Sequence, residues 1–158
     1  MIELKPIEGP RLSRSGRLIP AGLDEATIAA VVADFYGKAR VDDLLGPVFR
    51  AAIPDEKWPL HLAVIVDFWS SMLLGTGRYQ GRPMPVHLAL GNLDDRHFLR
   101  WLTLFRQTVE TVCAPEIAAL FVDRAERVAN SFRLGMAVHR GDDSSLLLPL
   151  RAPASPTK

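Results

Sequence analysis

Apolar residues recur at spacings of three and four along most of this 158-residue chain, and this periodicity constrains the fold more than any other feature. Such spacing places apolar side chains on one face of an α-helix. It predicts four helices, at about residues 24–40, 54–74, 92–113 and 115–139. We find no segment in which apolar and polar residues alternate between turns, as they do in a half-buried strand. The pattern therefore predicts an all-α domain.

Glycine and proline set the ends of these helices. Pro59 falls in the first turn of the second helix, where proline is tolerated, and the sequence GTGRYQGRP ends that helix. Only a short helical turn fits between Met84 and Leu90. Asn92, with Asp95 three residues later, resembles the N-cap of the third helix. A loop with one helical turn should therefore precede that helix.

The two ends of the chain lack this periodicity. Residues 1–22 contain three prolines and three glycines, so we expect an irregular arm there, followed by the domain at 23–140. Residues 141–158 are typical of a tail, although the stretch SSLLLPL is apolar enough to pack on another surface.

Composition narrows the possible partners. The formal net charge of +1 gives no reason to expect nucleic acid. The first residues lack the apolar core of a signal peptide, and the most apolar run contains Asp67 and is too short to cross a bilayer. A single cysteine, Cys113, cannot form an internal disulfide. We therefore expect a cytoplasmic protein with neither a nucleic-acid nor a membrane partner.

Histidines are the first candidates for chemistry. The chain has four, His61, His87, His97 and His139, and their spacing does not match a protein-only zinc site. We interpret His97, at the start of the third helix, as structural or as a neighbour of a cofactor edge. His139 is expected in solvent.

Three predicted helices each carry one side chain that ends in a polar group on an otherwise apolar face. His61 begins a stripe that continues with Ile65 and Trp69, Tyr36 ends the stripe of the first helix, and Trp101 lies among apolar residues of the third. An apolar lining with a few hydrogen-bond donors suits a flat apolar cofactor such as haem. Its iron takes one imidazole and leaves the other face for a small ligand. The spacing of apolar residues is compatible with a bound haem, but it does not by itself identify the cofactor.

The chain resembles the truncated haemoglobins of group III over residues 24–138, in the segments DFYGKARVDDLLGPVF, WPLHLAVIVDFWSSMLLGTGRYQGRPMPVHLAL and HFLRWLTLFRQTVE. The resemblance implies a truncated globin fold, which is a two-over-two helical sandwich around haem b. It also implies a much reduced helix before the proximal histidine, in agreement with the short turn that fits before Leu90.

The resemblance implies roles for ten residues. His87 falls on the proximal histidine, the axial ligand of the iron, and Tyr36, His61 and Trp101 fall on the distal residues that face the bound ligand. The other implied cofactor contacts, the last two of them near the haem propionates, are Phe49, Ile65, Trp69, Phe98, Arg78 and Tyr79.

The implied function is the binding of small diatomic ligands, namely O2, CO and NO, and of cyanide. The same donors could polarise an O–O bond, so peroxidase-like or nitric-oxide-detoxifying activity, supplied by a reductase, is a further hypothesis. The alternative class is a haem-free, globin-like interaction or sensor domain. The polar side chains directed into one cavity, together with His87, favour the haem protein.

Overall fold

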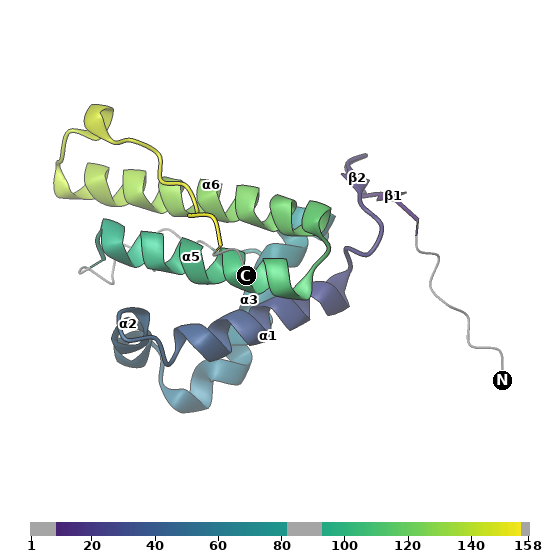
Figure 1. Cartoon of the computed structure of the whole chain (residues 1–158), viewed down its shortest axis with the longest axis horizontal. Helices are drawn as coiled ribbons and strands as arrows, with labels where there is room; N and C mark the ends of the chain where they lie inside the picture. Colours follow the sequence, from purple (N-terminus) through teal and green to yellow (C-terminus); the bar gives the residue numbers. More distant parts are fainter. Residues whose placement is uncertain (1–8, 82–92, 156–158) are drawn as a thin grey trace.

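Five α-helices carry the fold in the computed structural model, which describes residues 9–81 and 93–155 (Figure 1). The all-α prediction is confirmed. The helices are α1 (Glu25–Ala39), α2 (Leu45–Ala52), α3 (Trp58–Leu74), α5 (Asp95–Val112) and α6 (Pro115–Arg140), with short 3-10 turns η1 (Asp55–Lys57) and η2 (Ser144–Leu146). In the described ranges, no helix is both long and apolar enough to cross a membrane.

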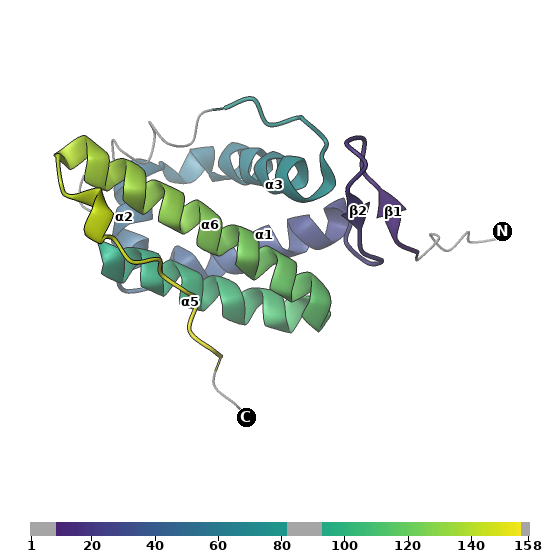
Figure 2. The same ribbon diagram turned by 90° about the horizontal axis from the view of Figure 1, so that it is seen from above.

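The helices pack in two pairs. Helix α5 lies along α6, and α1 packs on both α3 and α5, which joins the pair α1–α3 to the pair α5–α6 (Figure 2). The predicted apolar faces lie between them: Phe35 of α1, Val109 of α5 and Phe121 of α6 are at most 1% exposed. This is the two-over-two arrangement that the resemblance implied.

Local sequence signals explain most of the helix ends. The Asp24 carboxylate caps α1 by accepting from the Thr27 backbone N–H at 2.8 Å. Helix α3 has a proline in its first turn and ends at Leu74, as predicted. Gly75 follows in the left-handed region, with a φ of +71°, which favours glycine.

The N-cap of α5 is Asp94, so the prediction of Asn92 is wrong. Asp94 accepts from the Arg96 N–H at 2.9 Å, and its own backbone N–H donates to His97 Nδ1 at 3.2 Å. This reciprocal arrangement is a capping box in which histidine takes the place of the usual glutamate or glutamine. The bond gives His97 a structural role at the start of α5, and Asn92 lies outside the described residues.

The N-terminal arm is more ordered than we expected. Within its described part, β1 (Arg11–Leu12) and β2 (Leu18–Ile19) pair antiparallel, and Ile19 is only 3% exposed. Arg17 ties this hairpin to the end of α3 by donating to the Met72 carbonyl oxygen at 2.7 Å. Strands of two residues are too short to produce a recognisable alternation, so the sequence pattern could not reveal them.

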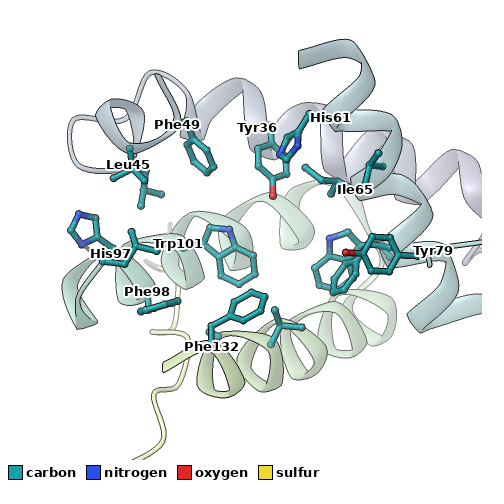
Figure 3. A pocket seen from close by; sticks show the side chains of 17 residues that line it. Tyr36, Leu45, Phe49, His61, Ile65, Tyr79, His97, Phe98, Trp101 and Phe132 are labelled. Atoms are coloured by element: carbon teal, nitrogen blue, oxygen red, sulfur yellow. The ribbon is translucent and has the colours of Figure 1, made fainter. Parts of the chain in front are cut away.

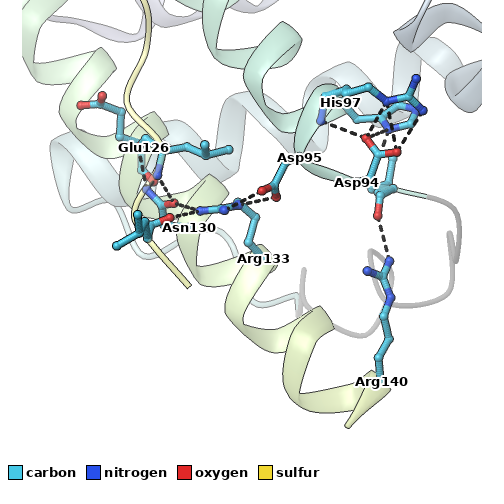
Figure 4. Close-up of polar contacts among 11 residues, drawn as sticks. Asp94, Asp95, His97, Glu126, Asn130, Arg133 and Arg140 are labelled. Carbon is cyan, nitrogen blue, oxygen red and sulfur yellow. Dashed lines mark hydrogen bonds and ion pairs between the residues drawn. The ribbon is translucent and has the colours of Figure 1, made fainter. Parts of the chain in front are cut away.

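The C-terminal tail packs back along α6. Arg133 donates to the Leu148 carbonyl oxygen at 2.8 Å, and the Leu150 backbone N–H donates to Asn130 Oδ1 at 2.8 Å. The Arg133 guanidinium also donates through Nε and Nη2 to the two oxygens of the Asp95 carboxylate, at 2.8 and 2.9 Å. One buried side chain therefore joins α5, α6 and the tail (Figure 4). The predicted docking of this segment is observed mainly through backbone groups, because Leu146 and Leu148 remain 77% and 79% exposed, while Leu150 packs against the core.

A candidate cofactor cavity

A cavity of about 310 Å³ opens between the two helix pairs (Figure 3). Its volume lies at the lower end of the range typical of small-molecule sites, about 300–1,000 Å³. Most of the lining is aliphatic or aromatic, and its polar groups belong to two tyrosines, two histidines and two tryptophans. The lining residues are Tyr36, Leu45, Val48, Phe49, His61, Val64, Ile65, Phe68, Trp69, Tyr79, Leu93, His97, Phe98, Trp101, Val128, Ala129 and Phe132.

The structure brings together most of the site residues that the sequence predicted. His87 lies outside the described residues, and Arg78 does not line the cavity. The eight predicted residues that do line it are Tyr36, Phe49, His61, Ile65, Trp69, Tyr79, Phe98 and Trp101.

Tyr36 and Trp101 form the polar centre of the cavity. Their side chains share a hydrogen bond, and because an indole N–H can only donate, Trp101 donates and the Tyr36 oxygen accepts. Burial raises the pKa of the Tyr36 phenol well above its ordinary value of 10.0, so the phenol stays neutral at physiological pH. The phenol proton is therefore kept, and the bond from Trp101 does not use it.

His61 reaches the same region from α3. Its ring centroid lies 6.4 Å from that of Tyr36, and the two ring planes are nearly perpendicular, at 88°. Trp58 packs edge-on against the imidazole at a centroid distance of 5.3 Å and also contacts the Tyr36 ring at 5.9 Å. The polar side chains of Tyr36, His61 and Trp101, which come from three helices, thus lie close together in the cavity, between His97 and Tyr79 (Figure 3).

Comparison with known proteins identifies the family. No family model matches the chain. The group 3 truncated hemoglobin of Campylobacter jejuni subsp. jejuni is 38% identical over 113 residues, which cover 70% of this chain and 89% of that protein. The chain belongs to the group III truncated haemoglobins. The crystal structure of a group III truncated hemoglobin from Campylobacter jejuni matches this truncated haemoglobin with a TM-score of 0.67 at 38% identity, over 70% of this chain and 89% of that one.

The lining of this truncated haemoglobin fits the haem that the family implies. Aromatic rings, among them Phe49 of α2 and Phe98 of α5, make up most of the wall together with aliphatic side chains, which suits a flat apolar macrocycle. The donors Tyr36 and Trp101 lie next to each other in the wall, as expected where a polar ligand binds at a single point.

Sequence reasoning missed the wall that α6 supplies. Val128, Ala129 and Phe132 line the cavity from this helix. Their spacing of one, three and four residues was visible as part of the helical pattern. The pattern could not show that this face borders a cavity, because that depends on how α6 lies against α5.

Arg78 has partners other than a cofactor. Its guanidinium forms an ion pair with Glu25 at the start of α1 and another with Asp67 of α3, at 3.3 Å. These contacts attach the loop after α3 to two helices. A contact with a haem propionate would require the guanidinium to share or exchange these carboxylates.

Proposed function

We propose that this truncated haemoglobin binds haem b in the cavity and holds a small ligand, such as O2, CO, NO or cyanide, against Tyr36, His61 and Trp101. One observation carries the proposal. Trp101 donates to the Tyr36 oxygen inside a largely apolar cavity, which leaves the phenol O–H available for a ligand. A neutral donor held in place in this way stabilises negative charge that develops on a bound ligand.

The residues of the chain divide the work. Tyr36 donates to the ligand, Trp101 orients the phenol by donating its one N–H to the phenol oxygen, and His61 adds an imidazole that can donate or accept. The apolar walls reduce the local dielectric, which strengthens these hydrogen bonds. When bound, haem would supply an iron that can bind one imidazole of the chain and one exogenous ligand.

The remaining assignments concern how the cofactor is held. His87 is proposed as the axial ligand. Phe49, Ile65, Trp69 and Phe98 would contact the macrocycle, and Arg78 and Tyr79 would lie near its propionates. We place the protein in the cytoplasm, where a reductase could serve any redox turnover with peroxide or nitric oxide.

Haem titration tests this function against the alternative of a haem-free interaction or sensor domain. We expect a Soret band that saturates at one haem per chain and that is lost or strongly shifted in His87→Ala. His139→Ala is the matched control, because His139 is exposed near the end of α6, and it should keep the band. A protein that stays colourless after haem addition would establish the haem-free alternative, whereas a band unchanged by His87→Ala would refute the axial assignment alone.

A further inference from the structure

A second, smaller cavity lies next to the first. It has a volume of about 220 Å³ and is bounded by the end of α1, by α2 and by the segment that leads into α3. Phe49 lines both cavities, whereas the charged residues Arg40, Arg50 and Asp55 line only the smaller one. The charged groups of this second cavity are therefore not part of the proposed haem site.

The Arg40 guanidinium lies in this cavity against an indole. Its central carbon is 4.3 Å from the centroid of the Trp58 ring, and Trp58 is only 3% exposed. A guanidinium that contacts a ring through its face keeps the N–H donors around its edge free to bind other groups. Arg40 Nη2 lies 3.5 Å from Asp55 Oδ1, but the Asp55 side chain is 91% exposed, so this ion pair is weak. Most donors of Arg40 are therefore available to another anion.

Arg50 adds a second guanidinium from α2. Gly46 permits the close approach of α2 to the end of α1, because a Cβ at this position would lie only 2.8 Å from the Arg40 carbonyl oxygen. Arg50 Nη1 donates to the same carbonyl oxygen at 3.4 Å. With two guanidinium groups and one carboxylate in its lining, the cavity carries a net positive charge.

Gly37 keeps the cavity open. It lies inside α1, where glycine is less favourable than alanine, and its φ is not in the left-handed region. A Cβ at Gly37 would have no neighbour within 4 Å apart from its own helical backbone, so close packing does not require glycine either. Because Gly37 lines the cavity, a larger side chain at this position would fill the space beside the two arginines.

We propose that this cavity binds a small planar oxyanion, of the nitrate or carboxylate class, between Arg40 and Arg50. The fork of donors on a guanidinium matches two oxygens of such an anion, and the flat face of the anion fits against the rings of Trp58 and Phe49. The site does not rest on the proposed haem function, because neither arginine lines the larger cavity.

The anion would lie directly behind two residues that face the larger cavity. Trp58 contacts the rings of Tyr36 and His61, with centroid distances of 5.9 and 5.3 Å. An anion bound against Trp58 is thus close to the proposed ligand site but separate from it. A test must therefore distinguish this cavity from an iron atom, to which anions also bind.

NMR titration of the full chain makes this distinction. Where haem is present, its iron is kept ferrous and saturated with CO, so that an added anion does not bind there. Sodium nitrate and, separately, sodium acetate replace sodium fluoride at constant ionic strength. We expect saturable shifts of the Arg40 and Arg50 Nε–H signals and of the Trp58 indole N–H signal. Saturation by only one salt identifies an inorganic oxyanion or a carboxylate as the ligand, and saturation by both identifies their shared planar group.

Matched variants separate a defined site from the general attraction of anions to positive charge. Arg50→Gln and Gly37→Leu should each weaken binding about tenfold, the first by removing charged donors and the second by filling the cavity while both arginines remain. Asp55→Asn should strengthen binding, because a competing carboxylate is lost. Arg127→Gln is the charge control and should leave the affinity unchanged, since Arg127 is 70% exposed and pairs with Asp123 outside the cavity.

Three results would overturn the proposal. They are shifts that rise linearly with the concentration of both salts, a Gly37→Leu variant that binds as tightly as wild type, and equal weakening in Arg50→Gln and Arg127→Gln. Thermal unfolding checks that Gly37→Leu is folded, and its Tm should not fall because leucine is a better helix former than glycine. Failure of the haem proposal would change none of these outcomes, because the iron takes no part in them.

Discussion

Replacing Tyr36 with phenylalanine removes the donor on which the proposed ligand binding depends. The variant keeps the ring packing against Phe35 and Phe49, whose centroids lie 4.9 and 5.7 Å away, and loses only the hydroxyl. A hydrogen bond to a charged partner contributes about 1.5–3 kcal/mol. Since about 1.4 kcal/mol corresponds to a factor of ten, O2 should leave the haem-loaded variant about 10- to 100-fold faster.

The same substitution should lower the stability of the protein without haem. Trp101 loses the acceptor of its indole N–H, and because this side chain is only partly buried the loss should be about 1 kcal/mol, the lower end for an unpaired donor. Trp101→Phe removes the donor instead, so the double variant should destabilise less than the sum of the two single variants. Urea unfolding measures this coupling.

Stopped-flow measurement of O2 release provides the decisive comparison for Tyr36. An unchanged release rate in Tyr36→Phe would refute the role of the phenol as a ligand donor. Strictly additive stabilities in the Tyr36–Trp101 cycle would separately refute the hydrogen bond between the two side chains.

Three further predictions concern pH, the cap of α1 and the tail. Burial raises the pKa of Tyr36 above 10.0, so above pH 10.0 the folded protein keeps a phenol proton that the unfolded chain loses. This contribution to the free energy of unfolding is therefore complete below pH 10.0 and declines as the pH rises toward the folded-state pKa. Urea unfolding on both sides of pH 10.0 should show a smaller decline in Tyr36→Phe than in wild type, and equal declines would contradict the prediction. Asp24→Ala should cost about 1 kcal/mol in unfolding free energy while Asp24→Asn costs little, since asparagine also caps helices, and equal losses would contradict the capping role. Arg133→Met should release the tail and lower the free energy of unfolding by about 2 kcal/mol, because the charged hydrogen bonds to Asp95 and to the Leu148 carbonyl oxygen are lost. The Asp95 side chain is 63% exposed, so solvent can hydrate it once Arg133 is gone. Limited proteolysis should cut residues 147–155 faster than in wild type, and an unchanged digestion pattern would contradict the role of Arg133 in holding the tail.

The sequence was most informative where a local rule determines the structure. Helix α3 ends at Leu74 because Gly75 takes a left-handed conformation, and the glycine-rich stretch that begins there predicted the end of the helix. The cap of α5 was misplaced because Asn92 and Asp94 are both good capping residues two positions apart. Only the reciprocal bond between the Asp94 N–H and the imidazole of His97 selects the second.

Features that depend on how helices cross could not be predicted from spacing. Trp101 and Phe105 are one turn apart on α5, so their proximity was expected, whereas the stacking of Trp69 on Phe105 requires a particular arrangement of α3 against α5. The tail was recognised as apolar, but its binding to Asn130 and Arg133 is made largely by backbone groups, which carry no residue signature. Tyr36, His61 and Trp101 could be singled out because their polar groups interrupt apolar faces, whereas their proposed distal roles came from the resemblance to the family.

A crystal structure of the haem-loaded protein with cyanide bound would test the central claim most directly. We predict that the haem occupies the cavity between the two helix pairs, with His87 on the iron and cyanide on the side of Tyr36 and Trp101, within hydrogen-bond distance of the Tyr36 oxygen. A haem bound elsewhere, or a cyanide that faces only apolar side chains, would contradict the proposed function.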